Sequence, residues 1–323
     1  MQQLIDRIFC QHTSESFEKL ALEIYGWQRT HVPVYRKFVE LLGKSEPQSV
    51  AEIPFLPISF FKTHTVLAEG KQPAILFKSS GTTGMQRSCH AVADVSLYER
   101  SFLPTYEQFI GPLKEQLIFA LLPNYVEQGE SSLVYMVDHL IRATDHPLSG
   151  FYLNDATALL QAIEKGRKTG RKLVLFGVTY ALLDLAETGV DLSDVQIIET
   201  GGMKGRRKEI SKEMLHQTLK SAFGCDFISS EYGMSELLSQ AYSNRDGLFD
   251  LPSWMQVRLR DVNDPFSWVD GEKTGGVNVI DLANLYSCSF IATQDLGKIV
   301  NGRLQLMGRF DQADLRGCNL LVQ

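Results

Sequence analysis

Short apolar segments alternate with helical patterns through the middle of this chain, and the alternation limits the folds that it can adopt. The apolar segments are residues 74–78, 117–122, 173–176, 195–199 and 227–229. Helical patterns lie between some of them, at residues 156–168 and 208–223. Since a strand followed by a crossover helix returns parallel to the strand before it, the alternation predicts an α/β fold with parallel-rich sheets and flanking helices.

The first 70 residues are expected to be helical and to belong to the same domain. Apolar residues recur there at the spacing of one helix face, at Phe17, Leu20, Ala21 and Ile24. Ser14 and Ser16 precede or accompany them and can cap the start of a helix. A second helix is expected at residues 34–42, ended by Gly43, before an extended, proline-broken stretch at residues 53–62.

The pattern changes after about residue 245. Short strands are predicted at residues 256–260, 276–281, 287–293 and 298–307. The last of these contains Asn301-Gly302, a strong hairpin signal because both residue types tolerate a positive φ. We therefore expect an α/β core at residues 71–245 and a small β-rich subdomain at residues 246–308.

Composition argues against several classes of protein. The 323 residues carry 32 Lys and Arg against 38 Asp and Glu, a net charge of −6, whereas a sequence-independent nucleic-acid binder needs a basic excess. No apolar run approaches the ~18 residues of a membrane span, and the N-terminus lacks the basic flank and apolar run of a signal peptide. We expect a cytoplasmic protein with neither a membrane span nor nucleic acid as a partner.

The cysteines suggest free thiols rather than a disulfide framework or a zinc site. They are Cys10, Cys89, Cys225, Cys288 and Cys318. Their number is odd, they are widely spaced, and no C-x-x-C pair occurs. The histidines do not gather near them and no H-E-x-x-H motif is present, so the pattern predicts no transition-metal site.

A glycine-rich segment after the first predicted strand has the chemistry of a phosphate cradle. It consists of Ser79, Ser80, Gly81, Thr82, Thr83 and Gly84, and Arg87 follows. The glycines let successive N–H groups point into one concavity, and the hydroxyls add donors around it. Neither the Walker A spacing nor G-x-G-x-x-G is present, so a P-loop or a Rossmann site is disfavoured. A polar surface loop is the alternative interpretation.

Another loop at the end of a predicted strand contains Gly201, Gly202 and Met203. Loops at the carboxyl ends of strands are where open α/β sheets bind ligands. Paired glycines permit close backbone approach to a flat ligand such as a purine, although an ordinary tight turn would use them equally well. The basic residues that follow are typical of a solvated helix start.

Further candidates lie near the next predicted strand and around the hairpin. Tyr232 can stack on a base, the Ser235 hydroxyl can contact a phosphate, and Glu236 can hold Mg²⁺. Asp295 can accept hydrogen bonds from ribose hydroxyls, and Arg309 can reach phosphate or ribose oxygens. Taken singly, each segment is also compatible with ordinary turn chemistry.

The order of these segments resembles that of the core motifs in the adenylate-forming superfamily of acyl-CoA synthetases and related ligases. The resemblance runs from about residue 54 to the C-terminus and rests on residues 79–87, 200–205, 232–236, Asp295 and 308–311. Within the superfamily, the chain looks closest to the acyl-protein synthetase (LuxE) and phenylacetate-CoA ligase branches. The closest details are Phe60-Phe61-Lys62 and the terminal run from Asp311 through Arg316-Gly317 to Asn319-Leu320.

The resemblance implies a role for each matching position. The segment from Ser79 to Gly84 would grip the β- and γ-phosphates of ATP, with Arg87 where the family usually has lysine. Gly201, Gly202 and Met203 would line the adenine, with Tyr232 against it. Ser235 would contact the α-phosphate, Glu236 would hold Mg²⁺, Asp295 would bind the ribose, and Arg309 would contact ribose or phosphate. Asp311 would lie at the hinge that ends the large domain.

The chain also departs from the family pattern. Gln86 replaces the usual proline before the basic residue, and Gln294 replaces the glycine before the ribose-binding aspartate. Residues 309–323 would be the hinge and a stub of the C-terminal domain. The resemblance places a mobile domain with a family lysine beyond that point. The enzyme would be complete in this short form, or a partner protein would supply the function of that domain.

The activity implied by the resemblance is ATP-dependent activation of a fatty or aromatic acid, with transfer of the acyl group to a thiol. The acceptor would be coenzyme A, a carrier protein or a protein cysteine, for which Cys318 is the candidate in this chain. A non-catalytic scaffold that binds nucleotide or acyl group, or a half-enzyme, is the alternative. A serine hydrolase is disfavoured because no G-x-S-x-G elbow occurs.

Overall fold

The central sheet of the computed structural model has the parallel arrangement that the sequence predicts. The structure describes residues 1–43, 46–79, 86–123, 130–153, 155–201, 210–269 and 272–310. Strands follow the order β5-β4-β6-β7-β8-β9, with β4 to β8 parallel and β9 antiparallel. Their bounds are β4 (Gln116–Leu121), β5 (Gly150–Phe151), β6 (Lys172–Val178), β7 (Val195–Thr200), β8 (Ser229–Tyr232) and β9 (Ala241–Ser243).

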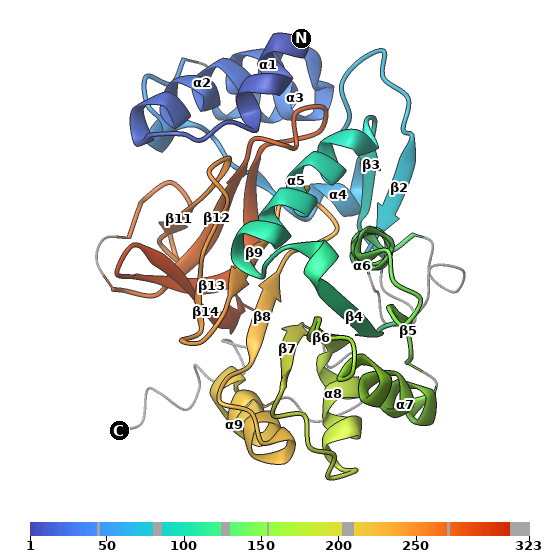
Figure 1. The fold of residues 1–323 in the computed structure, drawn as a ribbon. Helices are drawn as coiled ribbons and strands as arrows, with labels where there is room; N and C mark the ends of the chain where they lie inside the picture. Colours follow the sequence, from blue (N-terminus) through green and yellow to red (C-terminus); the bar gives the residue numbers. More distant parts are fainter. Residues whose placement is uncertain are drawn as a thin grey trace, which may run out of the picture.

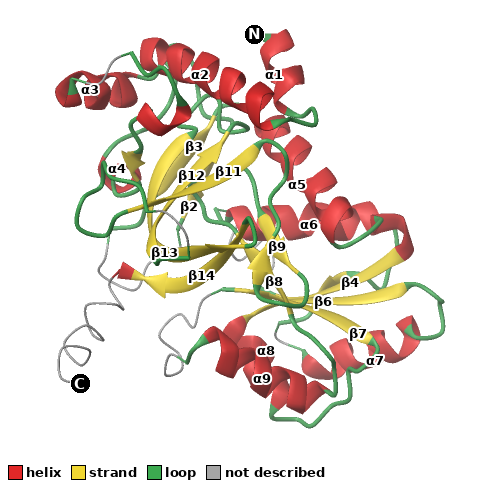
Figure 2. Cartoon of the chain, turned by 90° about the vertical axis from the view of Figure 1, so that its left-hand side faces the viewer, coloured by secondary structure: helices red, strands yellow, loops and turns green. Residues whose placement is uncertain are grey.

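Helices cover both faces of this sheet (Figure 2). On one face lie α5 (Val95–Phe109) and α6 (Ser132–Thr144); on the other lie α7 (Ala156–Gly166), α8 (Thr179–Ala186) and α9 (Lys212–Phe223). Every residue of β4 is buried as a result, which is why that strand is a continuous apolar run apart from Gln116. The predicted α/β architecture is confirmed.

A second, largely antiparallel sheet follows in the sequence and packs beside the first (Figure 1). Its order is β10-β14-β13-β12-β11, with β10 (Leu248–Phe249), β11 (Met255–Arg260), β12 (Gly275–Asp281), β13 (Phe290–Val300) and β14 (Arg303–Arg309). Asn301 and Gly302 join β13 to β14 with φ values of 50° and 77°, so the predicted hairpin is confirmed. An early segment, β1 (Leu56–Pro57), pairs in parallel with β13.

The N-terminal helices pack against the second sheet. They are α1 (Gln2–Ile8), α2 (Ser14–His31) and α3 (Pro33–Leu42). The buried amide of Gln28 in α2 donates to the carbonyl oxygens of Asn284 and Leu285 at 3.0 and 2.8 Å, and its Oε1 accepts from the Ser289 N–H at 3.0 Å. This amide satisfies backbone groups of the loop between β12 and β13, so it fixes the helical region to that loop.

Local details of the N-terminal region differ from the prediction. The residue that caps α2 is Thr13, whose side chain accepts from Ser16 N–H in a capping box, so Ser16 is the third helical residue rather than the cap. The expected extended stretch at residues 53–62 contains only the short β1 as strand. It then turns into a helical segment, α4 (Phe60–Thr63), in which Phe61 is buried and its two neighbours are partly exposed. Short 3₁₀ helices lie at Val50–Glu52 and Leu113–Glu115.

The first predicted core strand lies outside the parallel sheet. It is β2 (Ile75–Lys78), which pairs antiparallel with β3 (Cys89–Val92). The expectation that residues 74–78 join the parallel strands was therefore wrong: β2 pairs instead with β3, which follows the glycine-rich segment in the sequence. Leu76 is 41% exposed in this ribbon, whereas the residues of β4 are all buried.

Within the described residues, no helix is both long and apolar enough to cross a membrane.

Candidate active site

A cavity of about 750 Å³ opens where the strands of the central sheet end. Val178, Thr200 and Tyr232 are the last residues of β6, β7 and β8, and all three line it. Leu306 and Arg309 of β14 line it from the second sheet. The volume falls within the ~300–1,000 Å³ typical of ligand pockets, and the carboxyl ends of parallel strands are where open α/β sheets bind ligands.

Tyr232, Asp295 and Arg309 come together although they are far apart in the sequence. The phenol of Tyr232 donates to Asp295 Oδ2 at 2.8 Å, and Tyr232 is only 7% exposed. Asp295 in β13 and Arg309 in β14 are paired in the strand register. The guanidinium of Arg309 also donates to Gln294 Oε1 at 3.0 Å. An aromatic ring, a carboxylate and a guanidinium thus meet beside the cavity.

Basic side chains dominate the charge at the cavity in the described part of the chain. Lys78, Arg87, Lys212 and Arg309 line it. Two acids, Glu130 and Glu231, also line it. Glu130 accepts from Lys78 Nζ at 2.5 Å, and Arg87 Nη1 is 3.9 Å from its second carboxylate oxygen. The Arg87 Nε–H donates to the Ser79 carbonyl. A polyanion such as a triphosphate suits this distribution of charge.

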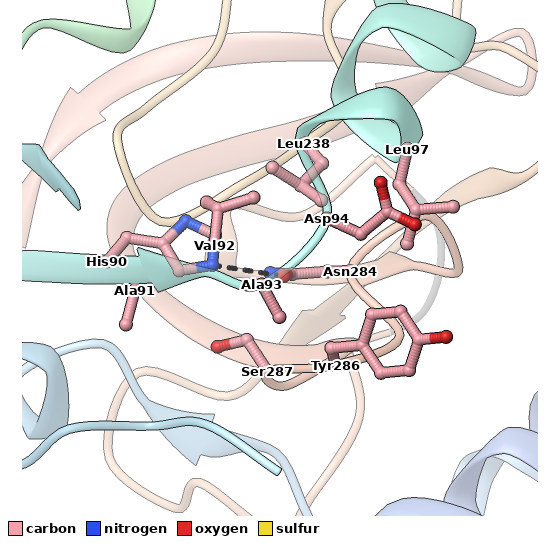
Figure 3. Close-up of a pocket in the computed structure, with 10 residues that line it drawn as sticks. All are labelled: His90, Ala91, Val92, Ala93, Asp94, Leu97, Leu238, Asn284, Tyr286 and Ser287. Carbon is pink, nitrogen blue, oxygen red and sulfur yellow. Dashed lines mark hydrogen bonds between the residues drawn. The ribbon is translucent and has the colours of Figure 1, made fainter. Parts of the chain in front are cut away.

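His90 and Asn284 contact the backbone of the turn that carries Ser235 and Glu236. The Ser235 carbonyl lies 2.8 Å from His90 Nδ1, and the Glu236 carbonyl accepts from Asn284 Nδ2 at 2.8 Å. His90 Nε2 is 3.1 Å from Asn284 Oδ1, the contact drawn in Figure 3. Burial lowers the pKa of His90 to about 4, so the ring is neutral at pH 7. This support was not predicted from the sequence.

The hollow beside His90 is too small to be a substrate site. It measures about 10 Å³, room for roughly one water molecule. Figure 3 shows Asp94, Tyr286 and Ser287 around it, with Asn284 reaching toward the histidine. We therefore assign His90 and Asn284 to positioning the turn.

Glu236 is a buried carboxylate with few groups to offset its charge. It is 6% exposed, and burial raises the pKa of its carboxyl group, whereas a hydrogen bond from the Ser88 side chain and the charge of Arg309 lower it. Ser88 in turn donates its backbone N–H to Ser79 Oγ at 3.0 Å, which connects Glu236 to the start of the glycine-rich segment. A divalent cation would offset this desolvated charge, so Glu236 fits Mg²⁺. The basic side chains of the cavity fit a nucleotide that would bind the same cation.

A group of buried acids lies at the ends of β7 and β8. The Thr200 hydroxyl donates to Glu231 Oε2 at 2.6 Å, and Thr179 donates to Glu199 Oε1 at 2.6 Å. Burial, with Glu199 nearby, raises the pKa of Glu231 to about 7, while Lys212 Nζ lies 3.5 Å from Glu199 Oε2. Sequence reasoning gave Glu231 no role, although period-two alternation sets its side chain opposite that of Tyr232.

The predicted site residues can now be located. Arg87, Gly201, Tyr232, Ser235 and Arg309 line the cavity, Asp295 bonds to Tyr232, and Ser79 and Glu236 are linked through Ser88. Outside the described residues lie Ser80, Gly81, Thr82, Thr83, Gly84, Gly202, Met203, Asp311 and Cys318.

Comparison with solved structures gives the fold. ATP-bound MatB from Rhodopseudomonas palustris is 18% identical with a TM-score of 0.53; the match covers 72% of this chain and 47% of MatB. A 2-hydroxyisobutyryl-CoA ligase, in complex with 2-HIB-AMP in the postadenylation state, is 11% identical with a TM-score of 0.64. That match covers 93% of this chain and 69% of the ligase. This chain therefore has the fold of the N-terminal domain of adenylate-forming enzymes and spans about half the length of MatB.

Sequence comparison adds nothing to this result. No model of a known protein family matches the chain, and no curated protein sequence does so either.

Proposed function

We propose that this protein activates a carboxylic acid with ATP, forming an acyl-adenylate and pyrophosphate, and then passes the acyl group to a thiol. The acid is fatty or aromatic, since Leu133, Met136 and Val178 give the cavity an apolar wall. The acceptor is coenzyme A, a carrier-protein thiol or a protein cysteine, as in the acyl-protein synthetases that the sequence resembles. A scaffold, or a half-enzyme that needs a partner protein to complete the site, is the alternative.

The observation that carries the proposal is the meeting of Tyr232, Asp295 and Arg309 at one edge of a basic cavity. Tyr232 comes from the central sheet, and Asp295 and Arg309 come from the second sheet. Each side chain suits a different part of a nucleotide: base, ribose and phosphate. The neighbouring turn adds the Ser235 hydroxyl and the Glu236 carboxylate. Fold neighbours in complexes with ATP and with an acyl-AMP support the same interpretation.

The reaction requires positioning and charge neutralisation rather than a protein nucleophile. A carboxylate oxygen attacks the α-phosphorus of ATP, the bond from that phosphorus to the bridging oxygen breaks, and pyrophosphate leaves with the electron pair. Arg87 and Arg309 would offset the charge that develops on the phosphate oxygens, and the Ser235 hydroxyl would donate to the α-phosphate. Glu236 would hold Mg²⁺, which supplies further charge neutralisation when bound.

Carboxylate-dependent ATP–pyrophosphate exchange tests the proposal directly. The protein is assayed with Mg²⁺ across a panel of fatty and aromatic acids, beside Glu236→Gln and the exposed control Glu213→Gln. We expect exchange that needs an acid, survives Glu213→Gln and is lost in Glu236→Gln. If ATP binds but no acid supports exchange in the wild type, the protein is a scaffold or a half-enzyme and the proposal fails.

A further inference from the structure

Lys78 and Arg87 approach the same carboxylate at the edge of the cavity. Lys78 Nζ lies 2.5 Å from Glu130 Oε1, and Arg87 Nη1 lies 3.9 Å from Glu130 Oε2. All three side chains line the 750 Å³ cavity, and the Glu130 side chain is 50% exposed. The Glu130 carboxylate therefore presents one oxygen atom to each cation, as a phosphate group would.

The backbone places Glu130 beside these cations. Lys78 is the last residue of β2, and its N–H donates to the Glu130 carbonyl oxygen at 2.8 Å. Glu130 directly precedes Ser131, which caps the start of α6 by accepting from the Val134 N–H with its hydroxyl oxygen. The carboxylate thus extends from a segment that is tied to both β2 and α6. The fold, and not only two flexible side chains, brings it to Lys78.

The two cations lie next to the segment that we assign to the terminal phosphates of ATP. The Arg87 Nε–H donates to the carbonyl of Ser79, the first residue of the glycine-rich segment, and Lys78 directly precedes that segment. Sequence reasoning gave Lys78 no role. The hydrogen bond from Lys78 lowers the pKa of Glu130, so its carboxylate is charged at pH 7. Glu130 therefore competes with any anion that approaches these cations.

We infer that Glu130 occupies the place of a terminal ATP phosphate, and that the triphosphate displaces this carboxylate and binds Lys78 as well as Arg87. The inference rests on the proposed function, because it assigns the basic side of the cavity to ATP. Exposed ion pairs contribute little to stability, so Glu130 can leave at small cost. A triphosphate carries more charge than a carboxylate and competes effectively for the same cations. The returning carboxylate would then favour the release of pyrophosphate, which contains the same terminal phosphates.

The test measures binding and chemistry separately. Isothermal titration calorimetry uses Mg·ATP, pyrophosphate and AMP, of which only AMP lacks the terminal phosphates. Each is titrated into wild type, Glu130→Gln, Lys78→Met and the double variant. Glu15→Gln and Lys19→Met are the matched controls, because Glu15 and Lys19 also form an ion pair at 2.5 Å, in α2, and neither residue lines the cavity. Acid-dependent pyrophosphate exchange is measured in parallel with the same proteins.

We expect Glu130→Gln to bind ATP and pyrophosphate about two- to fivefold more tightly than wild type, because the competing charge is removed. Lys78→Met should bind both roughly tenfold more weakly, and the gain from Glu130→Gln should largely disappear in the double variant. AMP affinity should stay the same in every variant, and both controls should bind all three anions as wild type does.

Three results would overturn the inference: an ATP affinity that Glu130→Gln leaves unchanged or lowers, an equal change in AMP affinity, or no binding of ATP to wild type. If the expected shifts occur without pyrophosphate exchange, the proposed activity fails and the inference stands. Exchange together with an unchanged ATP affinity in Glu130→Gln would refute only the inference.

Discussion

The Tyr232 phenol donates a hydrogen bond of 2.8 Å to the Asp295 carboxylate across 63 residues of sequence. Tyr232 ends β8 of the central sheet and Asp295 lies within β13 of the second sheet. The bond thus joins the two sheets at the edge of the cavity, and it fixes the ring relative to the carboxylate that we assign to ribose. The geometry of a nucleotide site would depend on how these sheets meet.

Tyr232→Phe should weaken both the fold and nucleotide binding. The variant keeps the ring but removes a donor to a carboxylate, which we expect to cost roughly 1–2 kcal/mol of unfolding free energy. Denaturant titration measures this loss, and calorimetry with ATP measures the fall in affinity. If both the ATP affinity and the unfolding free energy were unchanged, the Tyr232–Asp295 hydrogen bond would contribute neither to nucleotide binding nor to stability.

Glu236→Gln should separate stability from activity. Because burial raises the pKa of Glu236, its charge is costly in the absence of a cation, and a neutral amide of the same shape removes that cost. We expect the variant to be at least as stable as wild type at pH 7.5 by thermal unfolding, yet to lose about 100-fold or more in exchange activity. A variant that unfolds more easily and stays active would argue for a structural role.

Glu231→Gln should change the pH dependence of stability. The folded pKa of about 7 is above the usual value of 4.5, so Glu231 contributes stability that is fully present below pH 4.5 and is lost as the pH rises through 7. The difference corresponds to about 3 kcal/mol at ~1.4 kcal/mol per pH unit. Relative to wild type, the variant should therefore gain stability between pH 4.5 and 8, as measured by urea titration at each pH. A difference that does not vary with pH would contradict the raised pKa.

Gly233→Ala should destabilise the protein, because it adds a methyl group at a crowded position that lines the cavity. The new methyl group would approach Glu231 Oε1 to 2.5 Å, and overpacking of this kind costs roughly 1–3 kcal/mol. Gly26→Ala in α2 is the control, because nothing lies within 4 Å of a Cβ there and alanine favours a helix by ~0.5–1 kcal/mol. Chemical denaturation should show destabilisation at position 233 and stabilisation at position 26. A Gly233→Ala variant that is as stable as wild type, or more stable, would refute the close contact.

Local sequence signals predicted the repeating parts of the fold well. The parallel strands at residues 117–122, 173–176 and 195–199 were visible because each is a short apolar run next to a helical pattern, and Asn301-Gly302 identified its hairpin. The partner of β2 was not visible, since an apolar run does not say which strand it pairs with. Likewise, the pairing of β1 with β13 joins segments that are distant in sequence.

Some residues of the candidate site could likewise be predicted from the sequence, and others could not. Motif order brought Tyr232, Ser235, Glu236, Asp295 and Arg309 into one hypothesis, and the structure gathers them around one cavity and its supporting turn. His90 and Glu231 were missed because their interactions depend on burial and on neighbours in other elements. The alternation of β8 could have indicated Glu231, but nothing in the sequence near His90 indicates that its ring contacts the turn that carries Ser235.

The most direct test of the central claim follows one oxygen atom. The protein is incubated with Mg·ATP, a thiol acceptor and an acid labelled with ¹⁸O in its carboxylate, and the nucleotide product is analysed by mass spectrometry. Attack of the carboxylate on the α-phosphorus predicts AMP that contains one ¹⁸O atom, together with unlabelled pyrophosphate. Label in inorganic phosphate with ADP as the product, or AMP without label, would contradict adenylate formation.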